Sequence, residues 1–213
     1  LEMKKSLVSL AMGTLALGIT EYVMMAILPN VSRSLHVSIP EAGHLISAYA
    51  IGVSAGAPLL VFAHKYKPKS ILLVLAAMMV AGAIISVLAP NYWVLLAARF
   101  ISGLPHGAYF GVASIVAVRL ADKGHEAGAV SAMIAGMTIA NLLGVPLATA
   151  LCNSLSWRFP FVLAMVCAML VLFFIWRWVP DTVSLLLTRT AFHPMSSSVE
   201  MAELISTDET LHT

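Results

Sequence analysis

Two charged side chains, Glu21 and Arg99, lie inside long apolar segments of the sequence. A charge buried in lipid costs several kcal/mol unless it faces a partner or a water-filled cavity. Glu21 lies about eight residues before Pro29 and Arg99 about eight residues after Asn91, so both lie about 12 Å inside the same membrane boundary. A pair of opposite charges at equal depth is therefore possible. Such a pair could be a proton-coupling site, since a carboxylate in a dry cavity can bind and release protons, or a structural ion pair that fixes two helices.

Other polar or adaptable side chains in the apolar segments are candidates for the wall of a substrate cavity. His106 follows Pro105, where the helix ladder is interrupted, and it could line a pathway or satisfy a freed carbonyl. Asn141 is expected to be a buried amide beside the Gly144-Val145-Pro146 break, bonding either substrate or a neighbouring helix. Tyr and Met side chains could form an adaptable wall or simply pack. The substrate-cavity candidates are Tyr22, Met25, Tyr49, His106 and Asn141.

The sequence contains no motif of a soluble enzyme. There is no Walker loop, no HExxH and no paired-cysteine zinc pattern, and the two cysteines indicate no disulfide framework. We therefore expect no catalytic residue, no metal site and no cofactor. The net charge is +2 and no basic patch is interleaved with aromatic residues, so nucleic acid is not an expected partner.

The composition indicates an all-α membrane protein. Hydrophobic residues make up 60 % of the chain and charged residues 10 %, against about 45–50 % and about 25 % in soluble domains. Since a span needs about 20 apolar residues, the chain has room for six transmembrane helices and a tail. The apolar runs predict spans at about Leu7–Leu28, Ala42–Ala63, Ile71–Ala89, Tyr92–Val118, Gly128–Leu151 and Phe159–Val179.

Turn and cap signals separate these spans. The first run is too long for a signal peptide and is predicted to be a helix that ends at Pro29-Asn30. Ser38-Ile39-Pro40-Glu41 is typical of a helix start, with Ser38 as the cap. Residues 1–181 are expected to form the membrane bundle, and the polar residues 182–213 a mostly disordered cytoplasmic tail.

The distribution of lysine and arginine predicts the orientation in the lipid bilayer. With a cytoplasmic N-terminus, the inner side receives nine basic residues and the outer side two, which favours cytoplasmic termini. The inner set is Lys4, Lys5, Lys65, Lys67, Lys69, Arg119, Lys123, Arg177 and Arg189; the outer set is Arg33 and Arg158.

Small residues recur at every fourth position in three spans, a spacing that places them on one helix face and allows close helix contact in lipid. The fifth span is expected to present a continuous ridge of them. The three series are Gly128, Ala132, Gly136, Ala140, Gly144, Ala148; Gly103, Gly107, Gly111; and Ala48, Gly52, Gly56.

Four stretches together resemble the N-terminal six-helix half of a major facilitator superfamily transporter, of the bacterial drug:proton antiporter group and its arabinose efflux permease type. They begin at Leu17-Gly18-Ile19-Thr20-Glu21, Ser38-Ile39-Pro40-Glu41, Ala98-Arg99-Phe100-Ile101-Ser102-Gly103 and Gly136-Met137-Thr138-Ile139-Ala140-Asn141. The resemblance implies six helices as a 3+3 inverted repeat, with substrate bound between two halves. It covers about residues 4–181, which is one half.

The resemblance also implies roles for individual residues. Arg99 and Gly103 match the span-four motif associated with proton coupling, and Gly107 continues its small-residue series. Gly144 and Pro146 match the span-five antiporter motif. The loop 64–69 keeps the basic charge of the gating motif in Lys65 and Lys69 but lacks its aspartate. The expected conformational or gating residues are Gly103, Gly107, Gly144, Pro146, Lys65 and Lys69.

The expected function is proton-coupled efflux of sugars, arabinose-like, or of small amphipathic drugs across a bacterial inner membrane. Its partners would be the small-molecule substrate, protons, and a second half or a second copy of the chain to complete the cavity. The alternative is a transport-inactive half or a membrane interaction protein.

Overall fold

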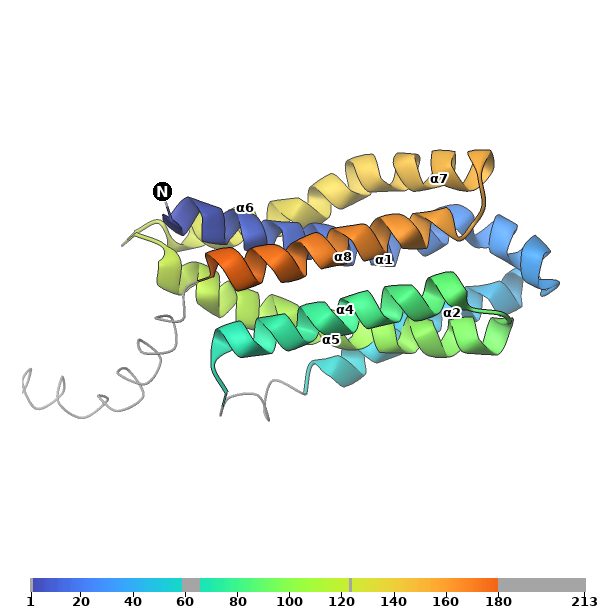
Figure 1. The fold of residues 1–213 in the computed structure, drawn as a ribbon, viewed down its shortest axis with the longest axis horizontal. Helices are drawn as coiled ribbons and strands as arrows, with labels where there is room; N and C mark the ends of the chain where they lie inside the picture. The colour runs from blue at the N-terminus through green and yellow to red at the C-terminus, as the bar shows by residue number, and fades with distance from the viewer. Residues whose placement is uncertain (1, 59–65, 123, 180–213) are drawn as a thin grey trace, which may run out of the picture.

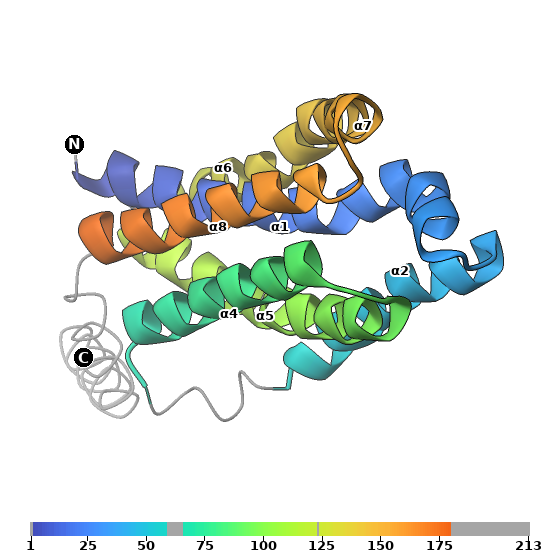
Figure 2. The same ribbon diagram turned by 45° about the vertical axis from the view of Figure 1, so that its right-hand side comes forward.

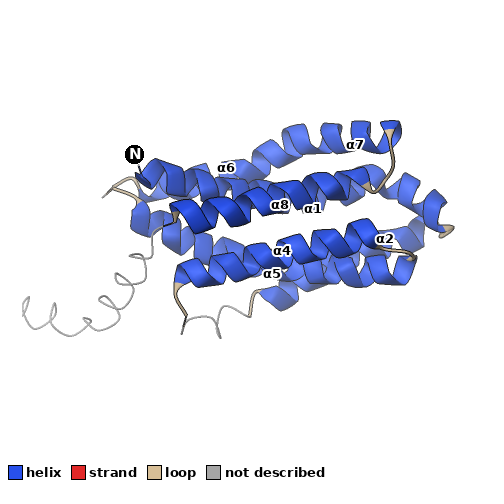
Figure 3. Ribbon diagram, viewed as in Figure 1, coloured by secondary structure: helices blue, strands red, loops and turns tan. Residues whose placement is uncertain are grey.

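The computed structural model describes residues 2–58, 66–122 and 124–179, and in these ranges the only regular structure is helical (Figure 3). Lys65 and the predicted tail at 182–213 lie outside the described residues. The helices are α1 (Glu2–Leu35), α2 (Ile39–Gly56), α4 (Pro68–Leu88), α5 (Tyr92–Leu120), α6 (Glu126–Ile139), the π-helix η1 (Ala140–Gly144), α7 (Val145–Ser154) and α8 (Phe159–Trp178).

Five of the described helical stretches are long and apolar enough to cross a membrane: Lys5–Leu35, Pro68–Leu88, Tyr92–Leu120, Glu126–Ser154 and Phe159–Trp178. Each coincides with a predicted span. The second predicted span corresponds to α2, which is not among the five. Its first turns carry Pro40, Glu41 and His44, which lower its hydropathy, and the predicted continuation to Ala63 lies outside the described residues. The predicted all-α, polytopic class is confirmed.

The predicted end of the first helix at Pro29-Asn30 is wrong, because α1 continues through Pro29 to Leu35. A proline within a helix removes one backbone hydrogen bond, and here the helix runs on for more than a turn. The end is set instead by His36, whose φ of 54° is left-handed. The Val37 N–H then donates to the Ser32 carbonyl at 3.1 Å, which closes the last turn in the manner of a Schellman motif.

Helices α2 and α5 pack backbone against backbone through glycines on both sides. A Cβ added at Gly52 would collide with the Phe100 carbonyl, and one at Gly103 would collide with the Tyr49 carbonyl. One at Gly107 would lie 2.5 Å from the Val53 carbonyl oxygen. Only glycine permits this approach, so the predicted small-residue faces of these two spans meet one another.

The small-residue series of the fifth span packs against α1 over only part of its length. Gly136, Ala140, Gly144 and Ala148 are buried, and a Cβ at Gly136 would collide with the Ala11 carbonyl. Gly128 and Ala132 are exposed, so the expected continuous ridge is wrong for its first two members.

The reason is helical geometry. Steps of four residues overshoot a 3.6-residue turn by about 40° each, so the series rotates off the contact face. The π-helix η1, with its wider i→i+5 turns, opposes this drift. Ala140, Gly144 and Ala148 consequently stay on the side that faces α1.

The helices form two groups, one of α1, α6–α7 and α8 and the other of α5, α2 and α4 (Figures 1 and 2). The first three spans are α1, α2 and α4, and the last three are α5, α6–α7 and α8. Replacing each span by its counterpart (α1 by α5, α2 by α6–α7, α4 by α8, and the reverse) turns each group into the other. Thus α1 packs on α6 as α5 packs on α2, and α1 packs on α8 as α5 packs on α4. This exchange of neighbours is what a 3+3 inverted repeat predicts.

The turn before α8 joins the two groups at one end of the bundle. The Trp157 indole N–H donates to the Ser34 hydroxyl at 2.8 Å, beyond Pro29 in α1. The Arg158 guanidinium donates to the Ala89 carbonyl at 2.8 Å and the Val87 carbonyl at 3.2 Å, at the C-terminal end of α4. The two bonds from Arg158 satisfy carbonyls that a helix end leaves unpaired.

Candidate functional site

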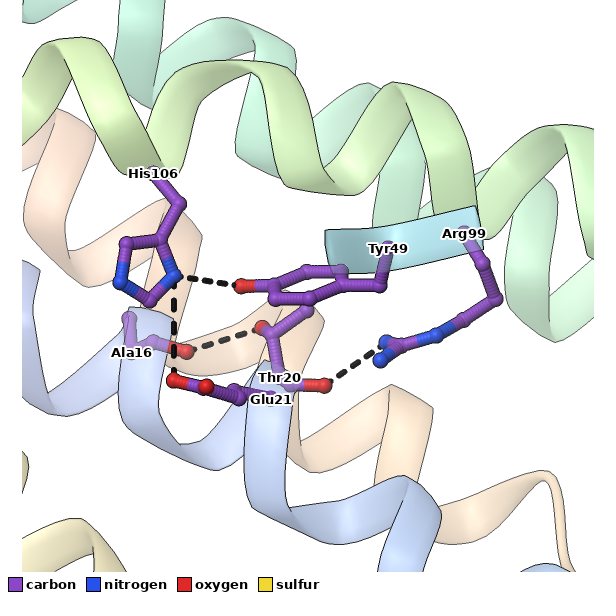
Figure 4. Close-up of polar contacts among 6 residues, drawn as sticks. All are labelled: Ala16, Thr20, Glu21, Tyr49, Arg99 and His106. Carbon is purple, nitrogen blue, oxygen red and sulfur yellow. Dashed lines mark hydrogen bonds and ion pairs between the residues drawn. The ribbon is translucent and has the colours of Figure 1, made fainter. Parts of the chain in front are cut away.

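A cavity of about 300 Å³ lies where α1, α2 and α5 meet. It is the place where the described charged residues of the membrane interior come together (Figure 4). The lining residues are Glu21, Met25, Ile46, Tyr49, Ala50, Val53, Ser54, Arg99 and His106. Polar groups from α1, α2 and α5 therefore share one apolar-walled space.

Arg99 is almost completely buried, with 1 % of its surface exposed. Its Nη1 donates to the backbone carbonyl of Thr20 at 2.7 Å, and its guanidinium lies 4.3 Å from the centre of the Tyr49 ring. The Nε and Nη2 groups have no hydrogen-bond partner. Buried polar groups are nearly always paired, so these two buried donors are an exception within a residue that lines the cavity.

Glu21 is partly exposed, with 33 % of its side-chain surface accessible, and its Oε2 is buried without a hydrogen-bond partner. The ion-pair contact that the structure records for it is with Nδ1 of His106 at 4.0 Å. Arg99 instead binds the carbonyl of the residue before Glu21. Both predicted proton-coupling residues thus line the cavity, and their coupling role stays a prediction.

His106 connects α5 to α2. Its Nδ1 lies 2.8 Å from the Tyr49 hydroxyl, and its ring stacks on Phe110 with centroids 5.3 Å apart. Both side chains of the hydrogen bond are buried, His106 being 8 % and Tyr49 3 % exposed. His106 follows Pro105, which lies inside α5 without ending it. The imidazole is therefore fixed by a hydrogen bond on one side and a ring on the other.

The predicted cavity residues divide into two sets. Met25, Tyr49 and His106 line the cavity, whereas Tyr22 is half-buried on α1 and is not one of its lining residues. The expectation that Asn141 is buried is wrong: it is exposed, in the π-helix η1, and does not line the cavity. The wide π turn directs the buried small residues at 136–148 toward α1 and leaves Asn141 exposed on a face of that span that does not contact α1.

The predicted gating residues that the structure describes are not among the lining residues of the cavity. Gly103 and Gly107 form the contact with α2, and Gly144 faces Ile19 of α1, where an added Cβ would lie 3.0 Å from the Ile19 Cγ1. Pro146 is exposed at the start of α7, and Lys69 lies in the first turn of α4. The three glycines shape helix contacts, and the gating role of all these residues stays a prediction.

One functional group escapes prediction from sequence, namely the Thr20 carbonyl that receives Arg99. No side-chain pattern marks it, because helix carbonyls are normally satisfied within their own helix. The Thr20 hydroxyl turns back to the Ala16 carbonyl at 2.8 Å and so points away from Arg99 (Figure 4).

Comparison with known proteins adds three findings on sequence. The family described as Major Facilitator Superfamily matches residues 10–199. AraJ of Escherichia coli strain K12 is 44 % identical over 180 residues, covering 84 % of this chain and 46 % of AraJ. "Inner membrane transport protein YdhP" of the same strain is 44 % identical over 158 residues, covering 73 % of this chain and 40 % of YdhP.

A more distant relative and a solved structure extend the comparison. "Probable sugar efflux transporter" of Helicobacter pylori strain G27 is 32 % identical over 162 residues, covering 76 % of this chain and 41 % of that protein. The inward-open structure of the xylose transporter XylE from E. coli matches with a TM-score of 0.69 at 15 % identity, covering 99 % of this chain and 57 % of XylE. The chain spans less than half the length of these curated relatives.

Proposed function

This multi-pass membrane chain belongs to the major facilitator superfamily, and we propose that it is the half of a transporter that exports a sugar in exchange for protons. The observation that carries the proposal is the cavity lined by Glu21, Arg99 and His106, in which Arg99 has two donors and Glu21 one acceptor without a hydrogen-bond partner. The substrate would bind between this cavity and a second half of the transporter, which another polypeptide segment or a second copy of the chain would supply.

Proton coupling is assigned to Glu21, with Arg99 as the neighbouring positive charge. A carboxylate inside the membrane is costly when charged, and marks proton pathways in transporters. The Glu21 side chain is open to the cavity, so a proton can reach it, while its Oε2 lacks a bond that would hold it in one charge state. Protonation of Glu21 would weaken its attraction to Arg99 and bias the movement of the two halves.

The choice of a sugar over an amphipathic drug follows from the chemistry of the cavity. The Nε and Nη2 of Arg99 need acceptors, and Oε2 of Glu21 needs a donor. A hydroxyl group is both donor and acceptor, so a polyol offers partners for both kinds of atom once the side chains move to expose them. Support also comes from the relative named as a sugar efflux transporter. Arabinose-like sugars are the first substrates to test, with amphipathic drugs as the competing class.

The proposed location is the bacterial inner membrane with cytoplasmic termini. The support is the excess of lysine and arginine in the loops on the side of the N-terminus. The relative named as an inner membrane transport protein agrees with this placement.

The test is transport in vesicles that contain the chain and carry an imposed pH gradient. Wild type should move labelled arabinose in exchange for protons, and Glu21→Gln should abolish the gradient-driven component while keeping the volume of the side chain. Arg99→Ala should reduce substrate exchange as well, because it removes the unpaired donors. Glu126→Gln, at the first residue of α6, is the matched control and should behave as wild type.

Unchanged gradient-driven transport in both Glu21→Gln and Arg99→Ala would refute the coupling assignment. Absence of transport by wild type, across several sugars and drugs, would favour the alternative of an inactive half or a membrane interaction protein.

A further inference from the structure

Three helices converge on one atom of the cavity, the Nδ1 of His106 in α5. The Tyr49 hydroxyl of α2 lies 2.8 Å from it, and Oε2 of Glu21 in α1 lies 4.0 Å from it (Figure 4). We propose that His106 is a second proton-carrying residue of this cavity and that Tyr49 and Glu21 compete for its Nδ1. The proposal rests on the proposed function, because it specifies where the coupled proton moves.

The competition follows from the number of hydrogen bonds that an imidazole nitrogen can accept. A neutral ring nitrogen without hydrogen offers one lone pair, so it accepts from one donor at a time. In the tautomer that leaves Nδ1 without hydrogen, the Tyr49 hydroxyl donates to it at 2.8 Å, and Oε2 of Glu21 lies 4.0 Å away, buried and without a hydrogen-bond partner. A change of the Glu21 rotamer that moves Oε2 about 1 Å closer to Nδ1 would bring these two atoms within hydrogen-bond range, which is near 3 Å. That bond forms only when Tyr49 gives up its own.

One proton moves from Glu21 to His106. The O–H bond of a protonated Glu21 breaks and an N–H bond forms at Nδ1 of His106, leaving a carboxylate and an imidazolium that attract one another. The Tyr49 hydroxyl, no longer able to donate to Nδ1, becomes an acceptor for it or turns to another group. Whether the Tyr49 hydroxyl of α2 donates to His106 of α5 therefore depends on whether the proton lies on Glu21 of α1 or on His106.

Among the described residues, few other titratable groups lie near His106. Arg99 lies on the same helix and directs its one hydrogen bond to Thr20, and Tyr22 of α1 is near enough to Glu21 and Tyr49 to interact electrostatically. The other helices packed on α5 are α4 and α6, whose own titratable residues, Lys69 and Glu126, lie in their first turns. His106 is thus the described base that Glu21 can reach.

The test compares two transport modes in the same vesicles. Arabinose counterflow exchanges substrate without net proton movement, whereas efflux driven by a pH gradient requires the proton step. His106→Asn keeps a hydrogen-bond acceptor near Nδ1 but cannot take a proton. Because His106 lines the cavity, we expect counterflow to fall in this variant, and gradient-driven efflux to fall about 100-fold further than counterflow, the usual contribution of a positioned proton-transfer group. His44→Asn, at an exposed histidine of α2, is the matched control.

Tyr49→Phe removes the competing donor and leaves the ring that Arg99 contacts. We expect the pH at which efflux is half-maximal to move by about 0.5 unit or more, since a hydrogen bond to one charge state alters proton affinity. Tyr66→Phe, at a tyrosine that is 69 % exposed, should leave the pH profile unchanged. If His106→Asn fails to fold, the pH profile of Tyr49→Phe decides the proposal.

The outcomes separate this inference from the proposed function. A wild-type pH profile in both His106→Asn and Tyr49→Phe, together with loss of coupling in Glu21→Gln, would overturn the role of His106 and keep proton-coupled export. Loss of counterflow and efflux alike in a folded His106→Asn protein would also overturn it, by assigning His106 to substrate binding. Absence of any transport by wild type would reject the proposed function itself.

Discussion

Arg99 of α5 donates from Nη1 to the backbone carbonyl of Thr20 in α1 at 2.7 Å. This bond joins the span that carries Arg99 to the residue next to Glu21, and it satisfies only one of the guanidinium nitrogens. Because the guanidinium is rigid and planar, fixing Nη1 also fixes the direction of the unpaired Nε and Nη2. The backbone of α1 thereby orients the two donors of Arg99 that have no hydrogen-bond partner.

Arg99→Lys tests whether the shape of the guanidinium matters beyond its charge. An ammonium can retain the bond to Thr20 or reach an acceptor in the cavity, but it cannot present the same fixed pair of donors. We expect sugar counterflow to fall by about tenfold or more, which corresponds to about 1.5–3 kcal/mol for a hydrogen bond to a charged group. Arg177→Lys, exposed in the last turn of α8, is the control. Wild-type counterflow in Arg99→Lys would show that charge alone suffices.

Gly103→Ala should destabilise the contact between α2 and α5. The added methyl group would collide with the Tyr49 carbonyl, a backbone atom that cannot move independently of its helix. Overpacking of this kind costs about 1–3 kcal/mol, measurable as a lower midpoint of thermal unfolding in detergent.

Gly128→Ala is the matched change in the same residue type. No atom lies within 4 Å of its added Cβ, and alanine favours helix by about 1 kcal/mol, so this variant should be neutral or more stable. Equal effects of the two substitutions would contradict the backbone contact at Gly103.

The start of α2 should confer a pH-dependent contribution to stability. Hydrogen bonds from Ser38 lower the pKa of the exposed Glu41 carboxyl below its ordinary value of 4.5. The Ser38 N–H and hydroxyl donate to Oε2 of Glu41 at 2.7 and 2.6 Å, and the Glu41 N–H returns a bond of 3.3 Å. A carboxyl with a lowered folded pKa stabilises the fold above its unfolded pKa and loses that contribution as pH falls through the folded pKa.

Ser38→Ala should therefore lower the unfolding midpoint by about 2 °C at pH 7 and by less near pH 3. Ser54→Ala is the control, because the Ser54 hydroxyl is exposed and bonds only the Ala50 carbonyl of its own helix. A difference between Ser38→Ala and wild type that stays constant from pH 7 to pH 3 would argue against the Glu41 pair.

Orientation is tested by two single-cysteine substitutions at exposed basic residues. With cytoplasmic termini, Arg33→Cys should react with a membrane-impermeant maleimide added outside intact cells, and Lys67→Cys should react only after the membrane is opened. The unmodified chain supplies the background from Cys152 and Cys167. Labelling of Lys67→Cys from outside would reverse the predicted topology.

The charged residues of the site can be located from the sequence, but their partners cannot. Depth along a helix is set by the number of residues, so residue spacing alone places Glu21 and Arg99 at one level. Their partners depend on helix rotation and on backbone atoms. The contact of Glu21 with His106 and the bond of Arg99 to Thr20 accordingly have no sequence signal.

The helix ends show the same division. Ser38 is recognisable as a cap because capping is local, involving atoms within three residues. The helix end expected at Pro29 is wrong, since whether a helix continues past a proline depends on what its following turn contacts. Here Trp157 bonds to Ser34 in that turn, from a segment far along the chain.

By itself the sequence determined the apolar spans, the small-residue faces of α2 and α5 and the two charges that must avoid lipid, because hydropathy and spacing act within each helix. The tertiary structure alone decided which helices pair, that η1 directs the fifth span toward α1, and that Arg99 meets Thr20. These relationships depend on the relative rotation of helices that are distant in sequence, a quantity that no local pattern contains.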